Sequence, residues 1–259
     1  MSEPSPPQQP PFVPLDAPGP PPENRRVQVL AAVVFLALVV AVGVVLLSGR
    51  SAPKITGDHG GPQDGRQART LINGIPQRGI TYGDPDAPVS IVEFIDFQCP
   101  YCGQHERFQQ AVVVQRLLRT GVARLTVQPL AFLGPDSGIA RNVYLRVAAK
   151  GHGFEFLHRA LLGQKAENSG YVTEAWLKRI TSGIPGITAA DLAPGRDATI
   201  QPQVDEAEAL AKRLIKEGDG TPFFAVGRTG ADPATFRKID LSAKDSAAES
   251  IVAAAEALR

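Results

Sequence analysis

The longest apolar segment of the chain lies near its N-terminus. Val29–Leu47 contains 19 successive residues without a charged or polar side chain. A helix of that length rises about 28 Å, close to the hydrocarbon thickness of a bilayer. A cleavable secretory signal would have a shorter apolar core and a small-residue cleavage site, whereas Leu46–Arg50 offers a poor one. We therefore expect an uncleaved transmembrane helix over residues 27–48.

Polar segments flank this apolar segment on both sides. Residues 1–26 hold ten prolines and predict an extended, disordered tail, with docking of a proline-recognising partner as the alternative. Residues 49–75 are rich in Gly, Asp, Gln and Arg and predict a flexible tether. Positive charges on the two sides of the apolar segment are nearly balanced. Because the short tail is the easier part to leave in the cytoplasm, we expect a single-pass cell-membrane protein whose C-terminal domain is extracytoplasmic.

Residues 76–259 alternate between strand-like and helix-like patterns. Short β-branched runs bounded by Gly and Pro predict strands, and longer apolar runs with helical spacing predict helices. We expect strands at Val89–Ile95, Val122–Leu130, Pro222–Val226 and Phe236–Leu241, and helices at Pro100–Arg119, within Ser137–Ser182, at Val204–Glu217 and within Ser242–Leu258. This order predicts one α/β domain with a helical insertion at about 137–200.

Charge and cysteine content narrow the function classes. The net charge is +1 and no basic–aromatic patch appears, so nucleic acid is not an expected partner. The chain has only two cysteines, Cys99 and Cys102, which form one C-x-x-C motif. A disulfide scaffold needs more pairs, and a structural zinc site needs four ligands that the chain cannot complete. We expect thiol redox chemistry without a metal or an organic cofactor.

The position of the motif assigns different tasks to its two cysteines. Cys99 follows the predicted strand Val89–Ile95 and directly precedes the predicted helix Pro100–Arg119. Exchange requires a thiolate, and a helix N-terminus stabilises a negative sulfur. Cys102 lies one turn into the helix, where it can close a disulfide with Cys99. We expect Cys99 to be the nucleophile and Cys102 the buried resolving thiol; two inert cysteines are the alternative.

The segment around the cysteines resembles a known family. E-F-I-D-F-Q-C-P-Y-C at Glu93–Cys102, followed by a predicted helix, is similar to the active-site segment of DsbA-like proteins of the thioredoxin superfamily. T-P-F-F at Thr221–Phe224, about 120 residues later, strengthens the resemblance. The likeness covers about residues 76–259. It implies a thioredoxin fold with a helical insertion, here in a membrane-anchored member.

The resemblance also implies the residues around the thiols. Thr221 and Pro222 match the family's cis-proline loop, which lies against the C-x-x-C motif and helps to bind the substrate backbone. A trans proline that opens a strand is the alternative. Pro100 and Tyr101, between the two cysteines, complete the expected active-site wall.

Four further polar side chains lie close to the motif in sequence. Glu93 occupies a position where the family often has a buried acid, so it is a candidate for proton transfer with Cys102 through a raised pKa. The alternative is that Glu93 reaches the surface or pairs with Arg124. Asp96, on the opposite face of the strand, could take the same role. We expect His105 to be a surface histidine and Glu106 a solvated charge. The alternatives are that His105 faces the site and influences the thiolate, and that Glu106 matches an acidic position in some relatives.

These observations predict an enzyme that oxidises thiols of exported polypeptides. A substrate thiolate would open the Cys99–Cys102 disulfide and form a mixed disulfide at Cys99. The resemblance implies a membrane redox partner that reoxidises the pair. An extracytoplasmic reductase or isomerase of the same fold is the alternative, because Pro-Tyr between the cysteines does not set the direction. A non-catalytic membrane-anchored binding protein is a second class, against which the intact Cys99, Cys102 and Pro222 argue.

Overall fold

A computed structural model describes residues 60–241 and 246–259 of the chain. Contacts between residues divide the chain into Met1–Thr56 and Gly57–Arg259, and all of the described residues belong to the second unit. The proline-rich tail and the apolar segment Val29–Leu47 lie outside the described residues. Within the two described ranges, no helix is both long and apolar enough to cross a bilayer.

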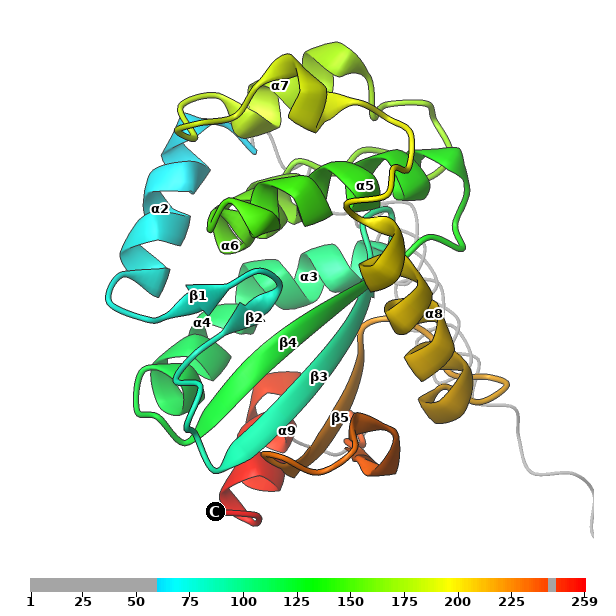
Figure 1. Cartoon of the computed structure of the whole chain (residues 1–259). Helices are drawn as coiled ribbons and strands as arrows, with labels where there is room; N and C mark the ends of the chain where they lie inside the picture. Colours follow the sequence, from blue (N-terminus) through cyan, green and yellow to red (C-terminus); the bar gives the residue numbers. More distant parts are fainter. Residues whose placement is uncertain (1–59, 242–245) are drawn as a thin grey trace, which may run out of the picture. The chain divides into compact units, whose positions relative to one another are not determined.

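A mixed sheet forms the centre of the described unit (Figure 1). In the described part of the chain its strand order is β1-β2-β4-β3-β5-β6. β3 and β4 are parallel, and the other neighbouring strands are antiparallel. Every residue of the central strand β3 is buried. The strands are β1 Gln77–Arg78, β2 Thr81–Tyr82, β3 Val89–Asp96, β4 Ala123–Leu130, β5 Phe223–Arg228 and β6 Arg237–Lys238.

Helices cover both faces of this sheet. α8 packs its buried Ala207 and Leu210 against Phe94 and Leu130, on one face. The larger core lies on the opposite face, where the sheet packs against α3, the insert helices and α9. The helical segments are α2 Pro62–Ile72, α3 Pro100–Phe108, α4 Gln110–Val113, a π-helical turn Val114–Leu118, α5 Pro135–Ala149, α6 Gly153–Leu162, α7 Glu174–Thr181, a 3-10 turn Ala189–Leu192, α8 Gln201–Leu214, a 3-10 turn Pro233–Thr235 and α9 Ala247–Glu256.

The prediction of a flexible tether at residues 49–75 is wrong for Pro62–Ile72, which form helix α2. α2 forms there and packs along α6, as Figure 1 shows. Ala68 and Ile72 are buried on its inner face, and Arg69 pairs with Glu155 of α6. The fully buried Arg159 of α6 also donates to the carbonyl of Gly60 at 3.2 Å. These anchors lie about 90 residues away in sequence, so the local composition of the segment does not reveal them.

Two expected helices are interrupted. The helix expected over Pro100–Arg119 is broken at Gln109, whose backbone departs from helical geometry, and continues as α4 and a π-helical turn. The block Ser137–Ser182 divides into α5, α6 and α7, and Gly151 adopts φ +82° at the first break. The hairpin of β1 and β2 was not expected, because two-residue strands are too short to show a periodic pattern.

Candidate active site

The two thiols lie at the junction of β3 and α3. Cys99 is the N-cap residue of α3, with extended backbone angles, and Pro100 occupies the first turn, where its missing N–H leaves no bond unmade. The carbonyl of Cys99 accepts from the N–H of Gly103 at 3.2 Å, which starts the helix. Cys99 is 5% exposed and Cys102 1%, and both are free thiols. The placement expected from the sequence is confirmed, whereas the separate roles of the two thiols stay a prediction.

A cis-proline loop lies directly against Cys99. The Thr221–Pro222 peptide bond is cis, as expected from the resemblance. In its protonated form, the Cys99 thiol donates to the carbonyl oxygen of Thr221 at 3.0 Å. β5 begins at Phe223, which pairs with Phe94 of β3, so the sheet brings the loop to the end of the strand that carries the motif. The sheet thereby brings Thr221 into contact with Cys99, although the two residues are 122 positions apart in sequence.

The two thiols differ in acidity. The pKa of Cys99 is lowered to about 6, chiefly by the hydrogen bond from the Cys102 thiol, with further help from the backbone N–H groups of Tyr101 and Cys102, while burial opposes the shift. Burial, and then the neighbouring Cys99, raise the pKa of Cys102 well above its usual range. At neutral pH the pair therefore holds a thiolate at Cys99 and a thiol at Cys102, which is the division needed for nucleophilic attack.

Two exposed aromatic side chains belong to segments that adjoin the Cys99 turn. Tyr101 is 65% exposed and Phe132 is 57% exposed. Phe132 belongs to the loop after β4, whose backbone is hydrogen-bonded to Asp96 at the end of β3. Sequence reasoning missed Phe132, although an aromatic residue directly after a strand parallel to β3 is a usable signal. Together with Pro100, these side chains give the site an apolar border.

A concavity of about 240 Å³ adjoins the cis-proline. Pro222 and Phe223 line it together with the paired Asp219 and Lys238. The Lys238 ammonium lies 5.7 Å from the centroid of the Phe223 ring. The concavity therefore combines an apolar wall with a charged edge. A polypeptide segment next to a reacting cysteine could use both features.

Glu93 is buried below the motif. The side chain is 2% exposed, and its Oε2 has no hydrogen-bond partner among the described residues. Burial, and then the charge of Glu106, raise the pKa of Glu93 well above its usual range. The alternative pairing with Arg124 is wrong, because Arg124 donates to Ser90 at 2.9 Å and to the carbonyl of Pro85 at 3.2 Å. Glu93 thus meets the expectation of a buried acid with a raised pKa.

His105 and Glu106 are not at the surface, and both interpretations as solvated side chains are wrong. Each residue is 4% exposed, because α6 covers Glu106 and strand β5 covers His105. Glu106 pairs with Nδ1 of His158 at 2.6 Å, and the His105 ring lies 4.9 Å from that of Phe224. Their positions three and four residues after Cys102 place all three on one helix face. That spacing was the signal available in the sequence.

Asp96 has a different environment from Glu93. It is fully buried, and its carboxylate accepts four hydrogen bonds from neighbouring backbone N–H groups and the Ser137 hydroxyl. The proposed exchange of roles with Glu93 therefore has no support in the geometry. Asp96 instead joins the end of β3 to the loop after β4.

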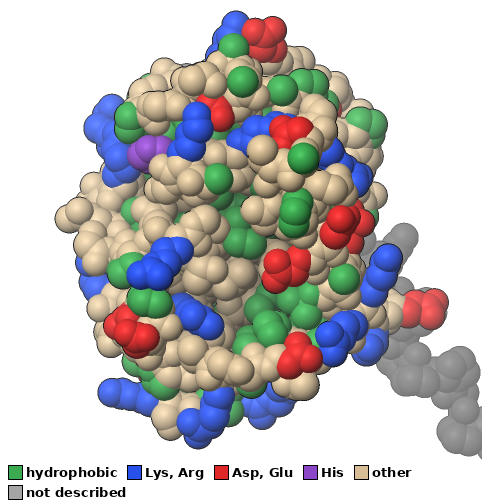
Figure 2. Space-filling view, viewed as in Figure 1, with side chains coloured by type: hydrophobic (Ala, Val, Ile, Leu, Met, Phe, Trp, Pro, Cys, Tyr) green, Lys and Arg blue, Asp and Glu red, His purple; other side chains and the backbone are tan. Residues whose placement is uncertain are grey.

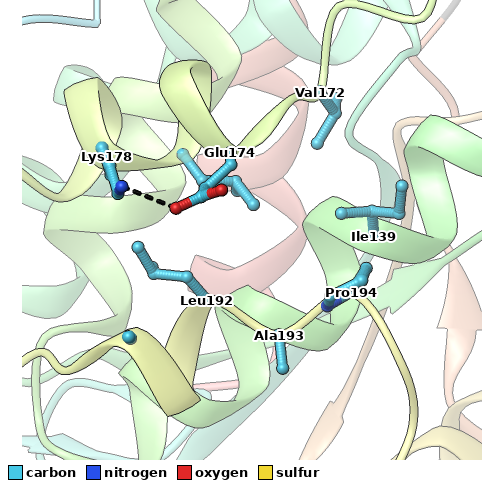
Figure 3. Close-up of a pocket in the computed structure, with 9 residues that line it drawn as sticks. Ile139, Val172, Glu174, Lys178, Leu192, Ala193 and Pro194 are labelled. Carbon is cyan, nitrogen blue, oxygen red and sulfur yellow. Dashed lines mark ion pairs between the residues drawn. The ribbon is translucent and has the colours of Figure 1, made fainter.

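A second pocket lies in the helical insert, apart from both cysteines. It has a volume of about 420 Å³ and lies between α5, α7 and the 3-10 turn Ala189–Leu192. Figure 3 shows Ile139 and Leu192 at this pocket, with the Glu174–Lys178 pair spanning 2.6 Å on α7. In the part of the chain that the structure describes, no cluster of His, Cys, Asp and Glu side chains could hold a metal ion.

One face of the described domain is mixed in charge. Figure 2 shows Lys and Arg side chains interspersed with Asp and Glu over the visible face, with hydrophobic side chains in a central hollow. A surface of this kind provides no single-sign field over this face.

A thiolate and a thiol that can close a disulfide, next to a cis-proline loop, define a protein disulfide oxidoreductase as the class. The sequence model of the family described as Thioredoxin matches residues 76–229. The chain belongs to this family.

Solved structures define the fold more closely. BdbD from Bacillus subtilis is 20% identical, with a TM-score of 0.57, and the match covers 70% of this chain and 92% of BdbD. DsbA from Chlamydia trachomatis is also 20% identical, with a TM-score of 0.55 and the same coverages of 70% and 92%. The expected thioredoxin fold with a DsbA-like helical insertion is confirmed.

One relative is longer than this chain. The Na(+)/H(+) antiporter NhaA 3 of Salinispora tropica is 31% identical over 160 residues, which are 58% of this chain. The match spans only 22% of the antiporter. The shared part is therefore a minor portion of that protein.

Proposed function

We propose that this protein oxidises cysteine thiols of exported polypeptides through the Cys99–Cys102 pair. The observation that carries the proposal is the unequal acidity of the two thiols at the N-terminus of α3, against the cis-proline loop. The exposed aromatic border and the concavity at Pro222 favour a polypeptide over a small thiol as substrate. We do not propose ion transport for this chain on the basis of the antiporter, because the match covers only 22% of that protein.

The reaction proceeds by two thiolate attacks. A substrate thiolate attacks Sγ of Cys99 in the oxidised pair, the Cys99–Cys102 bond breaks, and Cys102 leaves as a thiolate that takes up a proton. A second substrate thiolate then attacks the substrate sulfur of the mixed disulfide, and Cys99 leaves as a thiolate. Two electrons pass from two substrate thiols to the pair. Protonated Glu93, buried on the face of β3 towards α3, supplies the proton for Cys102.

The acidity of Cys99 favours the oxidising direction. A low thiol pKa stabilises the reduced pair, which makes the disulfide a stronger oxidant. The alternative is an extracytoplasmic reductase or isomerase with the same residues. The reduction potential of the Cys99–Cys102 pair distinguishes the oxidase from the reductase. A value of about −120 mV supports the oxidase, and a value of about −270 mV supports a reductase.

The apolar segment Val29–Leu47 supports a location at the outer face of the cell membrane. A membrane redox partner would then accept the two electrons from the reduced pair. An impermeant thiol reagent should label reduced Cys99 in intact cells. Protection of Cys99 until lysis would contradict this orientation.

The full chain, oxidised beforehand, should convert reduced ribonuclease A to its disulfide form. Cys99→Ser should abolish the reaction, because the nucleophile is lost. Cys102→Ala, mixed with oxidised insulin instead, should accumulate a mixed disulfide: the Cys99 thiolate attacks an insulin disulfide, one insulin cysteine leaves as a thiolate, and the resolving thiol is absent. If the wild-type protein neither oxidises ribonuclease A nor reduces insulin, the enzyme proposal fails and the binding-protein alternative takes its place.

A further inference from the structure

The turn that leads into Cys99 is tied to the loop after β4. The carboxylate of Asp96 is completely buried and accepts the backbone N–H groups of Phe132 at 3.0 Å and Leu133 at 3.2 Å. It also accepts the Ser137 hydroxyl at 2.5 Å and the N–H of Gln98 at 2.8 Å. Four donors on one buried carboxylate hold two chain segments in one arrangement.

Gln98 extends this connection to a third segment. Its amide nitrogen donates to the carbonyl of Leu133 and to the Ser137 hydroxyl, both at 3.0 Å. Its amide oxygen accepts the N–H of Asn168 at 2.7 Å. Asn168 has φ 56°, a left-handed conformation that asparagine tolerates better than most residues. Gln98 is 2% exposed, so all three bonds are shielded from water.

The segment around Asn168 also contacts the backbone of the turn. Gln164 donates to the carbonyls of Phe97 at 2.8 Å and Cys99 at 3.0 Å. The Tyr171 hydroxyl donates to the carbonyl of Phe97 at 3.2 Å. The helical insert therefore holds the Cys99 turn from two sides, through residues 132–137 and residues 164–171.

We propose that Asp96 and Gln98 are positioning residues that determine substrate specificity. They fix the loop of Phe132 and the segment of Asn168 as a rigid border beside Cys99, against which a polypeptide must dock. This inference rests on the proposed function. Neither side chain hydrogen-bonds to a cysteine sulfur, and the acidity of Cys99 comes chiefly from Cys102, with smaller contributions from Thr221 and the first turn of α3. Asp96 and Gln98 therefore act on the reaction of polypeptides more than on that of small thiols.

Three substitutions change this border in different ways. Gln98→Met keeps the length of the side chain but removes its three bonds. Asp96→Asn places an NH₂ group against donors, so part of the carboxylate's bonds must break whichever way the amide turns. Phe132→Ala removes only an exposed side chain and leaves the buried network intact. Asp136→Asn is the matched control, since this buried carboxylate lies next to Ser137 but makes no bond to the Cys99 turn.

The test compares two substrates in the full chain. The oxidised protein is reacted with a reduced cysteine-containing peptide and with dithiothreitol, and the ratio of the two rate constants is measured. We expect this ratio to fall about tenfold in Gln98→Met, Asp96→Asn and Phe132→Ala, and to stay at the wild-type value in Asp136→Asn. The pH midpoint of Cys99 alkylation should remain near 6 in all of them.

An unchanged ratio in Gln98→Met and Phe132→Ala would overturn the proposal. A shifted alkylation midpoint in Gln98→Met would overturn it as well, since the residue would then act on the thiol itself. Phe132→Ala keeps the test decisive if a buried variant fails to fold. A wild-type protein that is inert towards both the peptide and dithiothreitol would instead contradict the proposed function.

Discussion

Two regions of strand β3 each contain a buried carboxylate, and the two carboxylates differ in their hydrogen bonding. Asp96, at the C-terminal end, is surrounded by four hydrogen-bond donors. Glu93 lies three residues earlier on β3 and faces α3. Its Oε2 has no hydrogen-bond partner among the described residues. Burial is nearly equal, at 0% and 2% exposed. The number of donors, and not burial, distinguishes the two regions.

This difference separates structural from chemical use of the same functional group. A carboxylate with four donors fixes the segments that supply them. A buried carboxylate without such donors is held protonated by its raised pKa, and a neutral carboxylic acid can exchange a proton. The Asp96 region therefore holds the turn, whereas the Glu93 region has the protonation state that the proposed proton transfer to Cys102 requires.

The largest effect should come from disrupting the Asp96 region. Asp96→Asn leaves at least two buried donors without an acceptor, at a cost of about 1–3 kcal/mol each. We expect the free energy of unfolding to fall by about 3 kcal/mol, which corresponds to a Tm lowered by about 6–12 °C. Thermal unfolding followed by circular dichroism measures this change. Glu93→Gln is the matched comparison and should cause no such loss; equal losses in both variants would contradict the contrast.

The second effect concerns the rate of proton-coupled exchange. Glu93→Gln removes the acid that supplies Cys102, so release of Cys102 from the disulfide should slow by about 10²-fold near neutral pH. Stopped-flow fluorescence of the oxidised protein mixed with a reduced peptide measures this step. Asp136→Asn serves as the control, because this buried carboxylate is held by the N–H of Val172 in the helical insert and not at the Cys99 turn. A rate in Glu93→Gln equal to that of the wild type would remove Glu93 from the mechanism.

The third effect is the dependence of stability on pH. The folded-state pKa of Glu93 is raised, so its stabilising contribution is complete below the unfolded pKa, near 4.3, and is lost as pH rises through the folded pKa. Glutamine does not titrate. We expect Glu93→Gln to be more stable than the wild type, by a margin that grows with pH above about 4.3 and then levels off. Denaturant unfolding at a series of pH values checks the sign; a margin that shrinks with rising pH would contradict it.

The sequence was most informative where the chemistry is local. Cys99, Cys102 and β3 lie within a few residues of each other, and the strand–motif–helix order could be predicted from them. The resemblance added Thr221 and Pro222, which the sheet brings into place.

The sequence was least informative where a partner comes from another element. Glu106 meets His158 across 52 residues, and Asp96 meets Phe132 across 36. α2 depends in the same way on Arg159 of α6. The periodicity and composition of one helix or strand do not indicate which side chain from a distant helix will pack against it. For that reason the buried states of His105 and Glu106 were not expected.

The smallest effect tests whether the tyrosine hydroxyls near Glu93 take part in the proposed proton transfer. The hydroxyls of Tyr82 and Tyr144 are hydrogen-bonded at 2.7 Å, and Glu93 and Glu106 are near enough to contribute to the raised pKa of both groups. Tyr82→Phe removes one neutral hydrogen bond, and we expect a loss of about 1 kcal/mol, or a Tm lowered by about 2–4 °C.

The kinetic outcome of Tyr82→Phe is the sharper part of this test. The Cys102 release rate should stay within about twofold of the wild type, because burial raises the pKa of both tyrosines and keeps their protons in place. Stopped-flow measurement over a pH series gives this rate. A slowing comparable to that of Glu93→Gln would show that the tyrosine pair belongs to the proton path. The chemically active region would then extend from a single acid to the hydroxyls that join β2 and α5.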